Sequence, residues 1–390
     1  MWLPILVLAA ASELVPGAGP RSTSTPPLPP APLVADPIPR AAGTPELLYV
    51  NFDGGVLLDG CGNEARYNCS TLASLFDGYV GPFGGNETQR ISILQATRKT
   101  LADFGVRVVV SRPPDDVDYT MVMYGDLGPQ DFAGVAPYID CEDIHPNDTS
   151  FTGAFDTSNT GSTVILQEAA HTWGLEHVDA EFDVLNPFKS SGIHQSFTDE
   201  CHRIVANTDL QATAGSCNQI HTMFCESGFQ NSWQEMRWLF GPPIADTTAP
   251  KLEIVAPLPD EVFVLPATIP LVGAITDDLD PQFYHIEVYY ADQKLYDNNN
   301  IELNLLLEDP PEGEIELRVV IRDEAGNEDE QTIAFEILPK GSELPADNDL
   351  VLEDLPSEGC AVGSRRSGSY AGLWAVLAAG LVRRRRRRSV

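Results

Sequence analysis

The chain has 390 residues, of which 43% are hydrophobic, enough for two or three domains with ordinary globular cores. It carries 24 basic against 57 acidic residues, for a net charge of −33 at pH 7. A protein this acidic repels phosphate backbones, which argues against nucleic acid as a partner, whereas calcium binding is compatible with the charge.

The first residues have the pattern of a secretory signal. An apolar run from Trp2 to Ala11 ends in small residues, although it lacks a basic beginning. A short buried strand is the alternative, but the Pro-rich tract that follows gives such a strand nothing to pair with. We therefore predict a signal peptide at 1–11 and a semi-rigid linker at 12–45.

The region 46–241 reads as a mixed α/β (α+β) domain. A long helix is predicted over 87–104, with Gly105 as its stop. Ser232 and Glu235 form a capping box that predicts a closing helix. Short segments rich in apolar and β-branched residues predict strands at 47–55, 106–110, 118–124 and 151–155.

The segment from Gln167 to His177, QEAAHTWGLEH, follows an apolar lead-in and predicts a buried helix. Residues four apart share a helix face, so Gln167 and His171 point the same way, with Glu168 beside them. Gly174 can adopt the left-handed conformation that ends a helix, and the reversal would bring His177 back toward His171. We expect two imidazoles and one carboxylate to converge.

This segment resembles the signature of the metzincin zinc proteases, HExxHxxGxxH followed by a Met-turn, and the match is of the matrixin-like kind. It differs at the first zinc ligand, which is Gln167 here, and Leu185 stands at the methionine of the Met-turn. The resemblance implies a metzincin-like catalytic domain with a mixed sheet and an active-site helix. It also implies zinc bound by His171 and His177, with Gln167 as a poorer ligand and Glu168 as general base.

Three roles for Gln167 remain open. It ligates weakly through its amide oxygen, or Glu168 ligates instead and is lost as the base, or the fold is kept for binding without a metal. A further ligand could come from His194, His202 or Asp179. The remaining histidines are interpreted as structural: His145, His221 and His285.

Seven cysteines are unusual for a reducing compartment. Six lie in the region that holds the histidine motif, and the seventh is Cys360. An even set in an exported domain predicts up to three disulfides, whose connectivity the sequence does not fix. The pair Cys61 and Cys69 is favoured, since the loop between them is short and rich in turn formers. The six are Cys61, Cys69, Cys141, Cys201, Cys217 and Cys225.

Residues 246–338 predict an all-β sandwich. Seven or so short alternating segments are separated by turns of Pro, Gly, Asn and Asp. With Asp323 to Asn327 before the last strand, the region resembles a bacterial Ig-like module, a type that usually serves as a spacer or adhesive unit. Its Asp-rich turns could hold calcium, although charged turns are more often only solvated.

The C-terminal part divides into an acidic linker at 339–359 and a sorting or anchor segment at 360–390. Cys360 precedes an apolar run over 370–382, and six arginines follow at 383–388. The run is shorter than the roughly twenty residues of a membrane span, but the arginines favour an anchor whose end stays in the cytoplasm. The segment resembles the MYXO-CTERM sorting tag of myxobacterial exported proteins, which implies processing near Cys360 and membrane contact before it.

The expected function is that of an exported, surface-associated zinc-dependent endopeptidase acting on proteins or peptides. The expected location is the cell surface, the outer membrane or the extracellular space. The alternative, from a different class, is a non-catalytic surface protein that uses the same fold and the Ig-like module for binding or adhesion.

Overall fold

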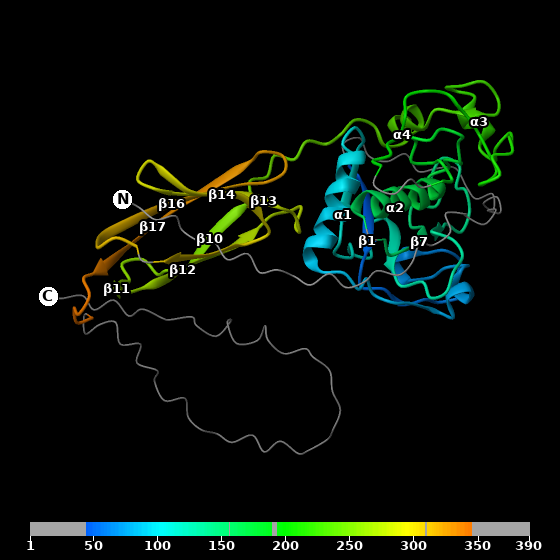
Figure 1. Cartoon of the computed structure of the whole chain (residues 1–390). Helices are drawn as coiled ribbons and strands as arrows, with labels where there is room; N and C mark the ends of the chain where they lie inside the picture. The colour runs from blue at the N-terminus through cyan, green and yellow to red at the C-terminus, as the bar shows by residue number, and fades with distance from the viewer. Residues whose placement is uncertain (1–43, 156, 189–192, 309, 345–390) are drawn as a thin grey trace, which may run out of the picture. The chain divides into compact units, whose positions relative to one another are not determined.

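The computed structural model describes residues 44–155, 157–188, 193–308 and 310–344 (Figure 1). All of the described residues lie within Met1–Leu344, one of the two units of the chain. The predicted signal peptide, most of the Pro-rich linker, and the sorting segment with Cys360 lie outside the described residues. Among the described helices, none combines the length and the apolar character needed to span a bilayer.

The first part is built on a five-stranded sheet in the order β4-β1-β5-β7-β6, parallel except for the edge strand β6. Every residue of β5 and β7 is buried, as expected for strands covered on both faces. Helices α1 and α2 pack on each other, and α2 packs on β5 and β7 (Figure 1). The elements are β1 (Glu46–Asn51), α1 (Glu87–Thr100), β4 (Val106–Val109), β5 (Thr120–Gly125), β6 (Gly134–Val135), β7 (Thr149–Gly153) and α2 (Ser158–Thr172).

Helix α1 begins at Glu87, as predicted, because Asn86 forms a capping box with Gln89. The Asn86 side chain accepts from the Gln89 N–H, and the Gln89 side chain accepts from the Asn86 N–H, each at 2.9 Å. The helix ends at Thr100, four residues before the predicted end at Phe104. The last apolar residues of the predicted helix lie in the turn that follows.

Short elements complete this part of the chain. Helix α4 begins at Ser232, but its N-cap is Asn231, so the capping box predicted for Ser232 is wrong. The Ser232 hydroxyl instead donates to Asp183 at 2.5 Å. The elements are β2 (Gly55–Val56), the 3₁₀ turns at Ala65–Tyr67 and Ala73–Phe76, β3 (Tyr79–Val80), β8 (His202–Arg203), α3 (Asn218–His221), β9 (Phe229–Gln230) and α4 (Ser232–Phe240).

Three disulfides connect the cysteines of the first part: Cys61–Cys69, Cys141–Cys217 and Cys201–Cys225. The favoured pair, Cys61 with Cys69, is confirmed. The other two join residues 76 and 24 positions apart, a separation from which no local pattern selects a partner. Three disulfides fit an exported protein.

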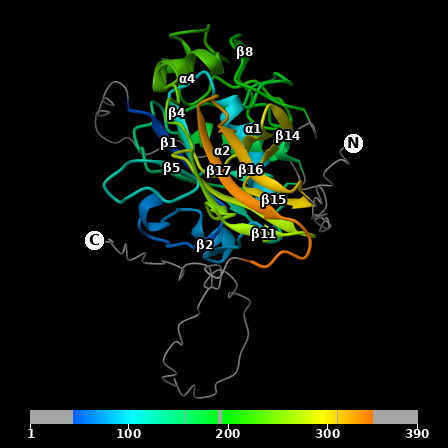
Figure 2. The ribbon, with the colours of Figure 1, turned by 90° about the vertical axis from the view of Figure 1, so that its left-hand side faces the viewer.

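Residues 251–338 form two sheets around one core, a three-stranded sheet β10-β12-β15 and a five-stranded sheet β11-β17-β16-β13-β14. Strand β15 alternates strictly between buried and exposed residues, so each sheet turns one face inward. Figure 2 shows β16 beside its antiparallel partner β17. The strands are β10 (Lys251–Ala256), β11 (Val262–Val264), β12 (Thr268–Thr276), β13 (Tyr284–Tyr290), β14 (Gln293–Asn300), β15 (Leu303–Glu308), β16 (Gly313–Arg322) and β17 (Glu328–Leu338).

The predicted fold class, an α/β (α+β) metzincin-like domain before a sandwich, is wrong. Among the described residues 35% are in strands and 17% in helices, so the structure is mostly β, and its strands form several sheets. The prediction rested on the order of a strand, a long helix and further strands, and on the resemblance to the metzincins. It had no signal for strands of two residues such as β2, β3, β8 and β9, which are too short to alternate.

Candidate metal centre

Helix α2 carries the polar residues of the histidine motif into the interior. It begins after Thr157, whose side chain accepts from the Thr160 N–H at 3.3 Å. Every residue from Gly161 to Thr172 is buried, including Gln167, Glu168 and His171. Burying so many polar groups costs free energy unless each has a partner, so the partners define the site.

Gly174 makes the reversal after α2 possible. Its φ is +95°, a conformation that side chains with a Cβ rarely adopt. A Cβ at this position would lie 2.8 Å from the Asp140 carbonyl oxygen and 3.0 Å from the Cys141 Cα. The turn leads the chain back to His177, and the expected approach of the two imidazoles is present.

The two imidazoles face each other through their Nε2 atoms, which lie 3.2 Å apart. His171 Nδ1 is 2.8 Å from the Leu175 carbonyl oxygen, and His177 Nδ1 is 3.4 Å from the carbonyl oxygen of Ala206. A carbonyl oxygen only accepts, so each Nδ1 carries the proton. In that tautomer each Nε2 has its lone pair available on the side of the other ring, where one cation could accept both.

The spacing suits one metal ion. With Zn–N distances of 2.0–2.1 Å, tetrahedral geometry puts two nitrogen ligands about 3.3–3.4 Å apart. Both histidines are buried, with 1% and 6% of their surface exposed. The carbonyl acceptors fix the tautomer and the orientation of each ring, the role that outer hydrogen bonds have in metal sites.

Gln167 has a different partner. Its side-chain Nε2 donates to the Asn186 carbonyl oxygen at 3.1 Å, so only its Oε1 could serve a metal. Asn186 belongs to the segment predicted as a Met-turn. In that segment Leu185 is buried, its N–H donates to Asp183 Oδ1, and its carbonyl accepts from Val178, the residue after His177.

Glu168 is fully buried and packs against Gly134 of the edge strand β6. A Cβ on Gly134 would lie 2.6 Å from Glu168 Cγ and 2.8 Å from its Oε1. Gly134 therefore leaves the space that the carboxylate occupies. The sequence interpretation did not identify this glycine, because nothing local connects the two positions.

The three candidates for a further ligand have contacts elsewhere. His194 Nε2 lies 3.5 Å from Thr100 Oγ1 of α1, and burial followed by the charge of Lys99 lowers the pKa of this histidine. His202 belongs to β8 and pairs with Gln230 of β9. Asp179 forms an ion pair with Arg203 at 2.7 Å.

Gln230 fixes the backbone just before His177, and the sequence analysis missed it. Its side-chain oxygen accepts from the Glu176 N–H at 2.8 Å, and its side-chain nitrogen donates to the Glu176 carbonyl at 3.1 Å. The Glu176 carboxylate accepts from the N–H groups of Ser216 and Cys217. These contacts position the loop that carries His177.

His221 lies buried between two carboxylates. Its Nδ1 is 3.0 Å from both oxygens of Glu235, and its Nε2 is 3.6 Å from Glu176 Oε1. Burial opposes the charged ring, but the carboxylates of Glu176 and Glu235 that face its two nitrogens outweigh burial and raise the pKa of His221 to about 9. Its structural interpretation agrees with these contacts.

The free energy of unfolding should therefore decrease as the pH rises from neutral to alkaline. A histidine whose folded pKa exceeds its unfolded value of about 6.5 stabilises fully below pH 6.5, and this contribution disappears as the pH rises through about 9. The change is on the order of 3 kcal/mol. Urea unfolding of His221→Gln should show a much flatter dependence over this window, and His285→Gln, at a half-exposed site, should follow the wild type. Parallel curves for wild type and His221→Gln would contradict the assignment.

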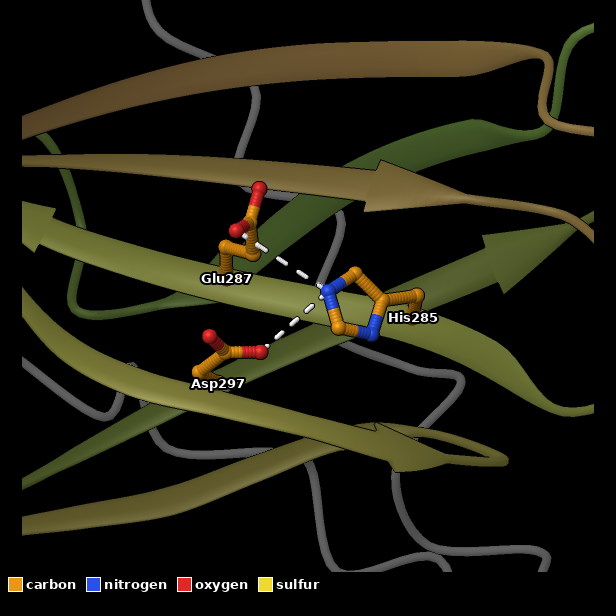
Figure 3. A group of neighbouring side chains, drawn as sticks. All are labelled: His285, Glu287 and Asp297. Atoms are coloured by element: carbon orange, nitrogen blue, oxygen red, sulfur yellow. Dashed lines mark ion pairs between the residues drawn. The ribbon is translucent and has the colours of Figure 1, made fainter.

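Two further groups of side chains could hold an ion. In the first, His285 Nε2 lies 3.2 Å from Asp297 and 3.9 Å from Glu287 (Figure 3). Hydrogen bonds from Lys294 and Arg322 lower the pKa of Glu287 to about 2, so cations of the chain already balance this group. The group is an ion-pair network on β13, β14 and β16, and the structural role of His285 stays a prediction.

The second group contains Asp246, Asp277 and Asp278, in the predicted Asp-rich turns of the sandwich. Burial and the neighbouring carboxylates raise the pKa of Asp277 to about 6. Acidic groups of this kind are common without an ion. The expectation that these turns bind calcium stays a prediction.

No family model matches the chain, and comparison with curated proteins finds no match. Among solved structures, the fibronectin(III)-like modules of Clostridium thermocellum CbhA are 12% identical with a TM-score of 0.23, covering 27% of this chain and 56% of that one. Carbohydrate-binding modules of the β-sandwich superfamily are 16% identical with a TM-score of 0.19, covering 24% of this chain and 36% of that one. At TM-scores this low, these likenesses assign neither a fold family nor a function to this chain.

Proposed function

We propose that this protein is an exported zinc-dependent endopeptidase that acts on protein or peptide substrates. The observation that carries the proposal is the pair of imidazoles, His171 and His177, whose Nε2 atoms lie 3.2 Å apart while each Nδ1 faces a carbonyl oxygen. Two neutral imidazoles oriented in this way fit zinc. At the cell surface or beyond, the processed chain would act on its neighbours.

The donor set also predicts weak binding. A catalytic zinc site has three protein ligands, and the third position here is Gln167, whose amide oxygen is a poorer donor than an imidazole nitrogen. Its amide nitrogen donates to the Asn186 carbonyl oxygen, which leaves Oε1 as the atom for a metal. We expect a site that holds zinc less tightly than three histidines would.

His171 and His177, with Gln167, would hold the zinc, which would supply Lewis acidity for the scissile carbonyl and for water. Glu168, three residues before His171 on α2, receives the proton of the attacking water and delivers it to the leaving amine. Because Gly134 has no side chain, the Glu168 carboxylate has room beside strand β6. Gln230 holds the backbone beside His177 and so preserves the geometry of the ligand.

The alternative function is non-catalytic binding at the cell surface. The hydrogen bond from Gln167 to Asn186 favours it, because the residue at the first ligand position already has a structural role. On this alternative the imidazole pair shares a proton in place of a metal ion. The two proposals differ in metal content and in the effect of replacing Glu168.

Elemental analysis of the secreted full chain at micromolar zinc tests the proposal. We expect near-stoichiometric zinc in the wild type, little in His171→Ala or His177→Ala, and no change in the control His285→Ala. Glu168→Gln should keep the zinc and lose peptidase activity on a labelled protein substrate. A wild type without zinc, or a zinc-loaded protein in which Glu168→Gln changes nothing, would favour the non-catalytic alternative.

A further inference from the structure

A second group of buried oxygen atoms lies in the loop that leads into β7. Asp140 and Asp148 are both 0% exposed. Asn63, far away in the sequence, donates from Nδ2 to Asp148 Oδ1 at 2.7 Å, and the Tyr138 hydroxyl donates to the same oxygen at 2.5 Å. Burial, together with the charge of nearby Asp140, raises the pKa of Asp148.

Three acceptor atoms in this group are buried and have no hydrogen-bond partner: Asn63 Oδ1, Asp140 Oδ1 and Asp148 Oδ2. The nearby donors serve the other carboxylate oxygens. His145 approaches Asp140 Oδ2 with its N–H at 2.7 Å and its Nδ1 at 3.3 Å. Each carboxylate therefore has one oxygen satisfied and the other bare, an arrangement that is costly in the interior unless something positive binds there.

The main chain holds these side chains in place. The Asp148 carbonyl accepts from the Met121 N–H at 2.8 Å, and the Asn147 carbonyl accepts from the Ala65 N–H at 2.7 Å. The Asp140 N–H donates to the His171 carbonyl at 3.1 Å. A site built on anchored backbone loses little conformational entropy when an ion binds.

We infer that Asp140, Asp148 and Asn63 form a calcium site. Calcium binds carboxylate and amide oxygens and tolerates irregular geometry, whereas magnesium demands near-ideal octahedral geometry, which three oxygens from separate segments are not arranged to give. Zinc prefers nitrogen and sulfur ligands, and the ring nitrogen that the structure places beside Asp140, that of His145, is already engaged with it. The site is separate from the imidazole pair and does not depend on the proposed peptidase function.

The position of the site gives calcium a structural effect on α2. The Asp140 N–H donates a hydrogen bond to the His171 carbonyl near the end of α2. The Asp140 carbonyl oxygen lies close to Gly174. The next residue, Cys141, is tied to Cys217. An ion at Asp140 would therefore stiffen the segment against which the turn between His171 and His177 packs.

Thermal unfolding of the full chain in calcium buffers, at constant zinc, tests the inference. Above the dissociation constant, each tenfold rise in free calcium should raise the Tm by roughly 3 to 5 °C. Asp148→Asn and Asp140→Asn should abolish this rise, because the amide keeps the shape and removes the charge. The control Asp277→Asn, in the sandwich, should retain it, and magnesium should act only at far higher concentration.

Asn63→Asp is a second variant that does not remove a carboxylate. It adds a charge to the ligand set, so the calcium-dependent rise in Tm should become larger. No rise in the wild type at millimolar calcium would overturn the inference. A rise lost in Asp277→Asn and kept in Asp148→Asn would place the ion in the sandwich turns. An Asp148→Asn variant that is more stable than the wild type, with no calcium response in either, would mean that protons neutralise the two carboxylates.

Discussion

Replacing Gln167 with histidine is expected to raise zinc affinity by orders of magnitude. Position 167 lies one helical turn before His171 on the same face of α2, so the introduced imidazole is a third nitrogen donor. The Asn186 carbonyl that now accepts from Gln167 is available to the Nδ1–H of the new ring. It would then have the role that Leu175 and Ala206 have for the two natural histidines.

Zinc affinity is measured by competition with a chelator of known strength. Gln167→Leu is the matched control, since it removes the amide without adding a ligand and should weaken binding. Peptidase activity should rise with affinity in Gln167→His as long as Glu168 is intact. If Gln167→His still does not bind zinc, the imidazole pair is not a metal-binding site. If activity falls while zinc binds, Gln167 has a catalytic or structural role of its own.

Removing the disulfide Cys141–Cys217 is expected to destabilise the protein more than removing Cys61–Cys69. The first closes a separation of 76 residues and the second a separation of 8. Loop-closure entropy assigns about 4.5 kcal/mol to the longer link and about 2.5 kcal/mol to the shorter one. The long link also joins the segment under Gly174 to the residues that bind Glu176, so zinc affinity should fall with it.

Urea unfolding of Cys141→Ser/Cys217→Ser and Cys61→Ser/Cys69→Ser gives the two free energies directly. The second double variant is the control for zinc, because its disulfide lies apart from the residues that hold His177. Equal losses of stability, or a loss of zinc in the control alone, would contradict the role assigned to Cys141–Cys217.

The parts of the fold that could be predicted are those encoded by neighbours in the sequence. The start of α1 follows from Asn86 and Gln89, three residues apart. The strict alternation of β15 predicts a strand with one buried face. The fold class could not be read in the same way, because the many short strands take their hydrogen bonds from distant segments and leave no periodic pattern.

The candidate site divides along the same line. The approach of His177 to His171 could be predicted, because the two residues are only six positions apart and Gly174 between them allows the chain to reverse. The acceptors that orient the rings could not, since the Ala206 carbonyl is backbone, and a backbone carbonyl has no residue type to recognise. Gln230 and the buried pair Asp140 and Asp148 were missed because their partners come from other segments.

Folding brings the imidazole pair together from separate segments of the chain. His171 lies on α2, its partner follows a turn packed on Cys141, and the acceptor of the second ring is at Ala206. A chain that crosses a membrane unfolded lacks this metal-binding site and therefore carries no ion across at that site. If the pair binds a metal as proposed, loading would follow secretion, and the metals available outside the cell would decide which ion binds.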